Sequence, residues 1–499
     1  MVVMRDNMEK VNQNVDTILK QIETKIHKSS DFFSRTVTLH RKKILYCFFE
    51  SVSSDDKISD FFMKSISNDI KYGKKSFFED LFDNLQNTIT NSKLTVIDDF
   101  SQVYYYLASG FTCIFIEGYE RYIVLETKSN LDRGVAEASS EAIIRGPKDS
   151  FTENHMTNIG LIRKRIKDPN LWMDEVKVGR RTKTKVAIGY IQDIVPKEKV
   201  ELVRNKIKKI DIDGILDSGY IMDFLSPKQH SSFPKIISTE RPDLVCGALL
   251  DGKICVLVEN SPFVLVMPGM LVDFLHSPED NYQKPANVIF TRGLRALAFF
   301  VTLLTPAIYI AITNFNQEMI PDRLLISLAI QREGVPFPTA FEVMLLGITF
   351  EMLRESDIRI PKVTGTAISV VGALVLGDAA VNAGIVSPIV VIIIALTSIC
   401  GLLFTDVDFT NALRGWRIFF ILCASIMGIV GIVAGGIIFV AKLASLESLG
   451  TPYLTPFSPL NLQAQKDNVI RTSRDKLRKR PSYLAPKNQT RLQVNYDEN

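Results

Sequence analysis

A long apolar region in the second half of the chain constrains the fold more than any other feature. Residues 296–441 are mostly apolar, whereas residues 1–290 mix charged and apolar side chains as soluble proteins do. A helix needs about 20 mostly apolar residues to cross a bilayer. Segments that approach or reach this length lie at 296–313, 363–380, 384–404 and 418–441. The sequence therefore predicts a multidomain chain with a cytosolic N-terminal half, an α-helical transmembrane domain and a short basic C-terminal tail.

Basic residues flank the apolar region on both sides. Arg292 and Arg295 precede its first segment, and the tail after Lys442 is rich in lysine and arginine. Because positive charges favour the cytosolic side, we expect both flanks to be cytosolic. Two cytosolic flanks require an even number of spans, so we expect four, with 339–353 as a short helix that does not cross. Five spans with an external tail is the alternative.

The N-terminal half alternates strand-like and helix-like runs, which favours two α/β or α+β subdomains. Phe111–Ile116 and Tyr122–Glu126 read as strands, two further strands join near Gly179, and a helix is expected to be capped near Thr157 or Asn158. The expected regions are a helical arm at 1–29, cytosolic subdomains at 30–135 and 136–290, a transmembrane helical domain at 291–445 and a proline-containing basic tail at 446–499.

No motif in the chain indicates catalysis. The six cysteines form no CxxC pair, the five histidines have no metal-ligand spacing, and YGKKS at 72–76 lacks the upstream glycine of a P-loop. We therefore expect reduced cysteines, no catalytic residue, no metal and no cofactor. Residues 161–209 hold 15 Lys or Arg against 6 Asp or Glu. This surplus is compatible with a solvated surface or an anionic leaflet, while nucleic acid is not expected.

Two carboxylates, Glu342 and Glu351, stand in the short apolar helix. They are nine residues apart, which places them on opposite faces, so they cannot share one metal or one proton. Charged groups in such a helix usually have a partner or a task. One hypothesis pairs Glu351 and Glu355, which share a helix face, with Arg354 and Arg359 at a membrane surface. The other has Glu342 or Glu351 face a water-filled path for cations.

The segment 363–380 carries a stripe that is polar at both ends and apolar in the middle. This stripe could pack against a neighbouring helix, or it could line a pore whose apolar waist gates by dewetting. The candidate pore-lining residues are Thr364, Ala367, Val371, Leu374 and Asp378.

Several ordered blocks, among them EAIIRGPKDSFTEN, FPKIISTERPD, SPFVLVMPG and PFPTAFEVMLLGITFEMLRE, closely resemble the GerA family. Members of this family are the A subunits of nutrient germinant receptors in bacterial endospores. The resemblance covers about residues 105–495. We expect the IRGPKDSFTEN loop to pack structurally near the junction of the two subdomains. The motif residues expected to be structural are Arg145, Gly146, Pro147, Glu240, Arg241 and Pro242.

The resemblance implies a receptor in the inner spore membrane. A subunits would associate into an ion-conducting ring, a transporter-like B subunit would bind the nutrient, and a lipoprotein C subunit would complete the complex. Nutrient binding would open a path for monovalent cations. Gly347 stands where relatives often carry an acid, which weakens any essential role for one carboxylate of this helix. A secondary transporter and a membrane-anchored signalling protein are the alternative functions.

Overall fold

The chain divides into two compact units in the computed structural model. The sheet unit comprises residues 1–227, 236–268 and 474–499, and the helical unit comprises residues 228–235 and 269–473. The structure describes residues 11–27, 29–39, 42–60, 82, 94–129, 141, 143–226, 231–359, 377–461, 465, 471–473, 476–486 and 488–491.

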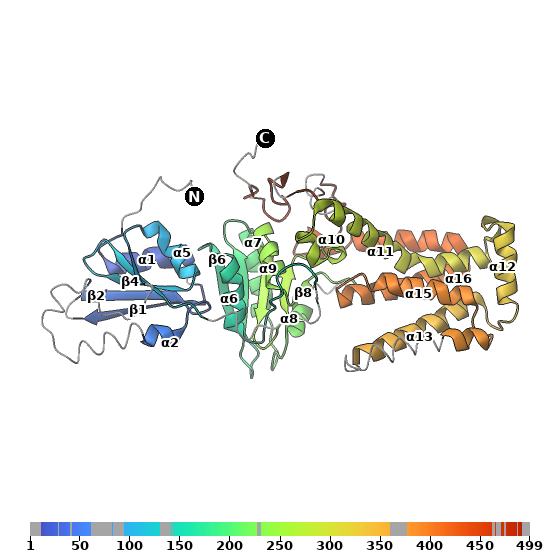
Figure 1. Ribbon diagram of the computed structural model, residues 1–499, viewed down its shortest axis with the longest axis horizontal. Helices are drawn as coiled ribbons and strands as arrows, with labels where there is room; N and C mark the ends of the chain where they lie inside the picture. Colours follow the sequence, from blue (N-terminus) through green and yellow to red (C-terminus); the bar gives the residue numbers. More distant parts are fainter. Residues whose placement is uncertain are drawn as a thin grey trace. The chain divides into compact units, whose positions relative to one another are not determined.

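The first half of the sheet unit is built on a five-stranded antiparallel sheet (Figure 1). Its strand order is β1 (Phe32–Leu39), β2 (Lys42–Phe49), β4 (Phe111–Ile116), β5 (Tyr122–Glu126) and β3 (Leu94–Ile97). The helices are α1 (Val15–Ile26), α2 (Asp55–Ile58) and α5 (Val103–Ala108). Val15, Ile18 and Ile22 of α1 share a core cluster with Leu45 and Phe49 of β2. The 3–4 spacing of these α1 residues gives the helix the apolar face that the sheet needs.

The second half of the sheet unit repeats the arrangement with another five-stranded sheet. Its strand order is β6 (Leu171–Val178), β7 (Thr184–Ile191), β9 (Ile254–Val258), β10 (Val264–Met267) and β8 (Ile237–Thr239). Its helices are α6 (His155–Arg165), α7 (Lys197–Lys208), α8 (Ser218–Leu225) and α9 (Pro242–Asp251). Residues of α6 and α9 share one core cluster with β6, β7 and β9. The two α+β halves expected from the alternating pattern are therefore present.

Local patterns predicted most of these elements. The strands at Phe111–Ile116 and Tyr122–Glu126 are confirmed, as is the strand pair joined near Gly179. The predicted start of α6 was wrong, because its N-cap is Asn154, whose Oδ1 accepts a hydrogen bond from the Thr157 amide at 3.0 Å. Asn158 cannot cap the helix because its buried side chain holds the backbone of the preceding loop.

A fully buried ion pair joins the two sheets. Arg163 of α6 binds Asp31 through two nitrogens, and its Nη2 lies 2.8 Å from Ser29 Oγ. Ser51 Oγ donates to Asp31 at 2.6 Å, and the Arg163 guanidinium stacks 3.9 Å from the ring centroid of Phe49. Burial raises the pKa of Asp31, but the charge and hydrogen bonds of Arg163 outweigh it, so the pKa lies below its ordinary value. The carboxylate is therefore charged and fully partnered.

The end of the chain packs onto the second sheet of this same unit. Leu484 and Ala485 are buried, and Ala485 belongs to the core cluster of α6 and α9. Arg480 Nε donates to the Leu250 carbonyl at 2.8 Å, and the Asn488 side chain donates to Asp193 at 2.8 Å. Part of the basic tail therefore binds protein within the sheet unit.

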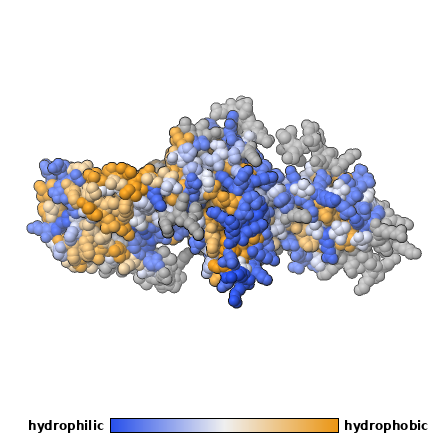
Figure 2. Space-filling view, turned by 180° about the vertical axis from the view of Figure 1, so that it is seen from behind, coloured by the Kyte–Doolittle hydropathy of each residue, from blue (hydrophilic) through white to orange (hydrophobic). Residues whose placement is uncertain are grey.

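The helical unit carries a large apolar surface (Figure 2). Its helices are α10 (Leu271–Leu275), α11 (Pro285–Asn314), α12 (Asp322–Arg332), α13 (Thr339–Arg359), α15 (Pro388–Gly401) and α16 (Val407–Ala444). Among the described residues, α11 and α16 are long and apolar enough to cross a membrane. With 14 residues, α15 is shorter than the span predicted at 384–404. With 21 residues, α13 is longer than the predicted helix at 339–353.

The chain reverses direction inside α16, at Gly428. Gly428 has φ 60° and ψ −137°, which is not helical. A β-carbon built on Gly431 would lie 2.1 Å from the carbonyl oxygen of Cys423, although residues eight apart in one helix are separated by about 12 Å along its axis. The rings of Trp416 and Phe439 lie 4.9 Å apart. The prediction of a single span at 418–441 was therefore wrong, since the segment forms two arms of a helical hairpin.

Candidate functional site: two carboxylates among the apolar helices

Glu342 lies in the first turn of α13 and is fully buried. Its Oε2 accepts hydrogen bonds from the backbone nitrogen of Ser387 at 3.1 Å and from the Ser387 hydroxyl at 2.9 Å. Ser387 is the N-cap of α15, so the carboxylate faces the positive end of that helix. Arg332 Nη2, at the end of α12, is 3.7 Å from Glu342 Oε1. Glu342 therefore ties three helices together.

The same end of the unit contains a further polar contact between helices. Thr339 Oγ1, at the start of α13, lies 2.8 Å from Asn314 Oδ1 at the end of α11. Thr313 Oγ1 donates back to the Tyr309 carbonyl within α11 at 2.8 Å. These bonds satisfy polar groups that apolar surroundings would otherwise penalise. They attach α13 to α11 as Glu342 attaches it to α15.

Glu351 lies nine residues further along α13 and contacts a different helix. Its Oε1 accepts a hydrogen bond from Arg417 Nη2 at 2.7 Å, and its Oε2 is 3.1 Å from Arg414 Nε. Both arginines belong to the first arm of α16. The prediction that the two carboxylates occupy opposite faces of one helix agrees with their contacts to α15 and α16. The hypothesis that Glu351 pairs with Arg354 named the wrong partner, and the Arg359 side chain lies outside the described residues.

The partners missed from sequence are Arg332, Ser387, Arg414 and Arg417. Arg414 and Arg417 did leave a signal, because they stand at i and i+3 directly before an apolar run. Arginines at the start of an apolar helix usually pair with a nearby anionic side chain. Ser387 left a weaker one, since a serine followed by Pro388 is a helix-start pattern whose free amide needs an acceptor. Neither pattern identifies which carboxylate is the partner.

Of the five candidate pore-lining residues, the structure describes Asp378. Thr364, Ala367, Val371 and Leu374 lie outside the described residues. Asp378 is described, lies in a helical turn and is exposed on the single chain. The assignment of this stripe to a pore stays a prediction.

The motif residues of the sheet unit fall into two groups. Arg241 is buried, and its Nη2 donates to the Pro147 carbonyl at 2.9 Å and to Asp243 at 2.9 Å. The Phe151 amide donates to the Glu240 carbonyl at 2.7 Å, which joins the same two blocks. Arg145 is exposed, however, so the expectation that its side chain packs structurally was wrong.

The loop is also held by a half-buried acid. Glu141 Oε2 accepts hydrogen bonds from Thr239 Oγ1 at 2.5 Å and from the Glu240 amide at 3.3 Å. Burial raises the pKa of Glu141 to about 7, against the lowering effect of these bonds and of Arg241. The described bonds of this loop thus reach β8 and the start of α9. The Arg163–Asp31 pair joins the two sheets elsewhere, and the placement of this loop near the junction of the two subdomains stays a prediction.

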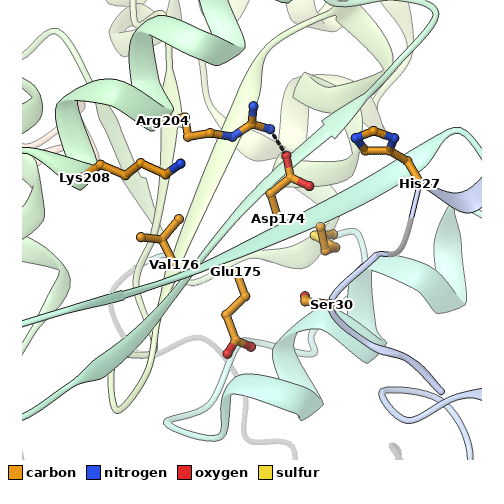
Figure 3. Close-up of a pocket in the computed structure, with 8 residues that line it drawn as sticks. His27, Ser30, Asp174, Glu175, Val176, Arg204 and Lys208 are labelled. Atoms are coloured by element: carbon orange, nitrogen blue, oxygen red, sulfur yellow. Dashed lines mark hydrogen bonds and ion pairs between the residues drawn. The ribbon is translucent and has the colours of Figure 1, made fainter.

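A cavity of about 390 Å³ opens beside the edge of β6 (Figure 3). Its lining residues are His27, Ser30, Met173, Asp174, Glu175, Val176, Arg204 and Lys208. Asp174 accepts hydrogen bonds from Arg204 and, at 2.8 Å, from Tyr190, while the His27 ring stacks 4.1 Å from Trp172. Because Asp174 and Arg204 partner each other, we assign the cavity no ligand.

Comparison with known proteins gives this geometry its context. The model of the Bacillus/Clostridium GerA spore germination protein family matches residues 20–483. The chain belongs to the GerA family. It is the A subunit of a germinant receptor and a membrane protein, rather than an enzyme, which confirms the resemblance drawn from the motif blocks.

Individual GerA relatives are similar over most of the chain. Spore germination protein KA of Bacillus subtilis (strain 168) is 40% identical over 407 residues, which are 82% of this chain and 75% of the relative. The uncharacterized membrane protein YfkQ of the same strain is 37% identical over 397 residues, or 80% and 77%. The crystal structure of the N-terminal domain of the A subunit of the Bacillus megaterium germinant receptor GerK3 is 27% identical with TM-score 0.41, covering 53% of this chain and 98% of that one.

The six cysteines agree with the sequence prediction. Cys47, Cys113, Cys246 and Cys255 are buried, and Cys400 and Cys423 are half-buried, all as free thiols. Burial raises the pKa of Cys246 to about 12, so this thiol is protonated at neutral pH. Buried, protonated cysteines are unreactive packing residues.

Proposed function

We propose that this A subunit assembles with copies of itself into a ring that conducts monovalent cations when the receptor senses a nutrient. The observation that carries the proposal is the difference between Glu342 and Glu351, which other side chains bind, and Asp378, which is exposed. Glu342 and Glu351 are held by Ser387, Arg414 and Arg417, so they fix helices. Asp378 is exposed on the single chain, where neighbouring copies in a ring could bring such residues together.

The remaining stripe residues suit a gate. Symmetric copies of Val371 and Leu374 would form a narrow apolar ring that excludes water when closed. Asp378 would ring one mouth and raise the local concentration of cations. A transporter-like B subunit that binds the nutrient and a lipoprotein C subunit complete the proposed receptor.

The packing of the tail supports a common cytosolic side for the sheet unit and the tail. Ala485 shares a core with α6 and α9, so the two ends of the helical unit lead to the same folded body. The number of membrane passes is then even. Because α16 is a hairpin, it adds two passes if it crosses or none if it re-enters. The first arm of α16 runs alongside α11. Phe409 contacts Phe299 in the first half of α11, and Gly428 contacts Phe315 at its end. This parallel course along α11 favours a full crossing.

A crossing hairpin changes the expected count from four spans to six. The α13 helix then crosses as well, since 21 residues rise about 31 Å and match the hydrocarbon thickness. The other passes are α11, the region 363–380 and α15. Glu342 would lie near one membrane surface, and Glu351, about 14 Å further along the helix, would lie near the middle of the bilayer, where its contacts with Arg414 and Arg417 offset the cost of its burial.

Cysteine labelling tests this topology. We expect an impermeant maleimide added to intact cells to modify Met427→Cys, whose parent side chain is 55% exposed at the hairpin tip. Ser482→Cys should react only after the cells are opened. Unmodified protein gives the background from Cys400 and Cys423. Labelling of Ser482→Cys from outside would overturn the even number of passes.

Cation release tests the conducting function. Asp378→Asn should lower the rate of potassium release from spores placed in a broth that germinates the parent strain, because the ring loses its negative charge. Glu318→Gln, another exposed carboxylate of the helical unit, is the matched control and should release potassium normally. Equal rates for Asp378→Asn and the parent, at equal receptor amounts, would count against this path.

A further inference from the structure

His155 is the first residue of α6 and is buried, with an exposed fraction of 5%. Neither nitrogen of its ring makes a hydrogen bond to another residue that the structure describes. Buried polar groups usually have a partner, because burial without one costs free energy. Packing alone therefore does not explain why an imidazole stands at this position.

Charged side chains from four other segments surround the imidazole. Glu175 of β6 places its Oε2 4.0 Å from His155 Nε2, and its Oε1 lies 4.0 Å from Lys185 Nζ of β7. Glu259, directly after β9, accepts a hydrogen bond from the Lys185 amide at 3.0 Å. Asp31, directly before β1, acts on the ring through its charge. The ring thus stands among three acids and one lysine, and Glu175 is too distant for a hydrogen bond to it.

The imidazole lies beside the contact between the two sheets. The Met173 carbonyl of β6 accepts a hydrogen bond from the Ser30 amide at 2.9 Å. Arg163, about two turns along α6 from His155, binds Asp31. The two elements that border the imidazole, α6 and β6, therefore also hold the first half of the sheet unit. A movement of the start of α6 away from β6 would disturb these contacts.

Three further charged side chains lie near Glu175. Asp174 and Arg204 bind each other on the opposite side of β6 (Figure 3). Glu50, directly after β2, has a raised pKa because it is partly buried and lies among other acids, Glu175 included. Acid conditions neutralise Glu50 as well, so a test needs variants in which His155 alone changes.

Opposing effects set the protonation of His155. Burial lowers its pKa below the ordinary value, and the charge of Lys185 acts in the same direction. The positive end of α6, where His155 stands, also disfavours a charged ring. Glu175, Glu259 and Asp31 favour the charged ring, but burial outweighs them. The closed site therefore resists a proton that an opened site accepts. Its packing is most stable above the ordinary histidine pKa of about 6.5 and loses stability as the pH falls below it.

We propose that His155 is a pH-sensitive switch in the contact between the two sheets. At neutral pH the uncharged ring permits the packing of α6 against β6. Protonation gives the ring a positive charge and a second N–H donor in a site where no described residue accepts a hydrogen bond from it. The start of α6 then separates from β6 more often, which weakens the hold of Arg163 on Asp31. This role is independent of the proposed channel, since it requires neither a ring of subunits nor ion conduction.

Hydrogen exchange of the full chain in nanodiscs at pH 7.5 and pH 5.5 tests the switch, once each rate is corrected for the intrinsic effect of pH. The peptides to follow cover His155–Arg165 and Leu171–Val178. Their protection should fall severalfold in the parent protein at pH 5.5. The fall should not exceed about tenfold, the limit for one proton that binds an opened site with a pKa of about 6.5.

Variants assign the effect to His155. His155→Gln and His155→Phe do not titrate, so either one that folds should show equal protection of these peptides at the two pH values. His27→Gln is the matched control, because His27 is exposed and stacks on Trp172 of β6, and it should keep the response of the parent. Glu175→Gln should enlarge the fall, because it removes an acid that favours the charged ring.

Two results would overturn the proposal. One is a parent protein whose protection in these peptides is the same at both pH values. The other is a fall in the non-titrating His155 variants that equals the fall in the parent, which would assign the response to acids such as Glu50.

Discussion

Arg163→Leu should lower the free energy of unfolding of the sheet unit by about 3–5 kcal/mol, because it leaves the carboxylate of Asp31 buried without its counter-charge. Both side chains of this pair are fully buried, and Ser29 and Ser51 are oriented around it. The loss should appear in native-state hydrogen exchange of the full chain. The amides of α6 and β6 should lose the most protection.

Arg165→Leu is the matched control on the same helix. Arg165 pairs with Asp149 at 2.6 Å, but the two side chains are 22% and 28% exposed. A pair of this kind contributes about 1 kcal/mol or less. A double change of Arg163 and Asp31 to leucine should cost less than Arg163→Leu alone, since no unpaired charge remains. Equal losses for Arg163→Leu and Arg165→Leu would refute the buried pair.

Gly428→Val should destabilise the helical unit by about 2–6 kcal/mol, the sum of backbone strain and overpacking. The backbone of Gly428, with φ 60° and ψ −137°, is one that valine adopts only with strain, and this strain costs about 1–3 kcal/mol. A β-carbon there would also lie 2.8 Å from Phe315 Cβ, and overpacking of this kind adds about 1–3 kcal/mol. The thermal midpoint of the purified full chain measures the loss.

Gly436→Val is the control for Gly428→Val. Gly436 lies in the second arm of α16, and a β-carbon on it would meet no atom within 4 Å. Its substitution should leave the midpoint close to that of the parent protein. If the two valine variants melt together, α16 is one continuous helix and the hairpin is wrong.

The elements that the sequence predicted are those specified by neighbouring residues. The strands Phe111–Ile116 and Tyr122–Glu126 follow from a local apolar pattern around a turn. The opposite-face placement of Glu342 and Glu351 follows from helix geometry alone. The family resemblance rested on ordered blocks rather than on single residues, and the match over 20–483 confirmed it.

The features that the sequence did not predict depend on one backbone angle or on distant pairings. Hydropathy averages over 418–441 cannot separate Gly428, which turns the chain, from Gly435 or Gly436, which stay helical. Asp31 and Arg163 are 132 positions apart, and Glu351 and Arg417 are 66 apart. Arginines near an acid in sequence, such as Arg354, are therefore a poor guide to its partner in a folded membrane domain.

Potassium release without nutrient tests the channel most directly. Spores that carry Val371→Ala should leak potassium in buffer alone, measured with an ion-selective electrode, because a smaller side chain lets water into the apolar ring. Val433→Ala, at a position of α16 that is 58% exposed, is the control and should retain potassium. If Val371→Ala assembles in normal amounts and retains its ions, while Val433→Ala or Val391→Ala leaks, the conducting path does not follow the segment 363–380.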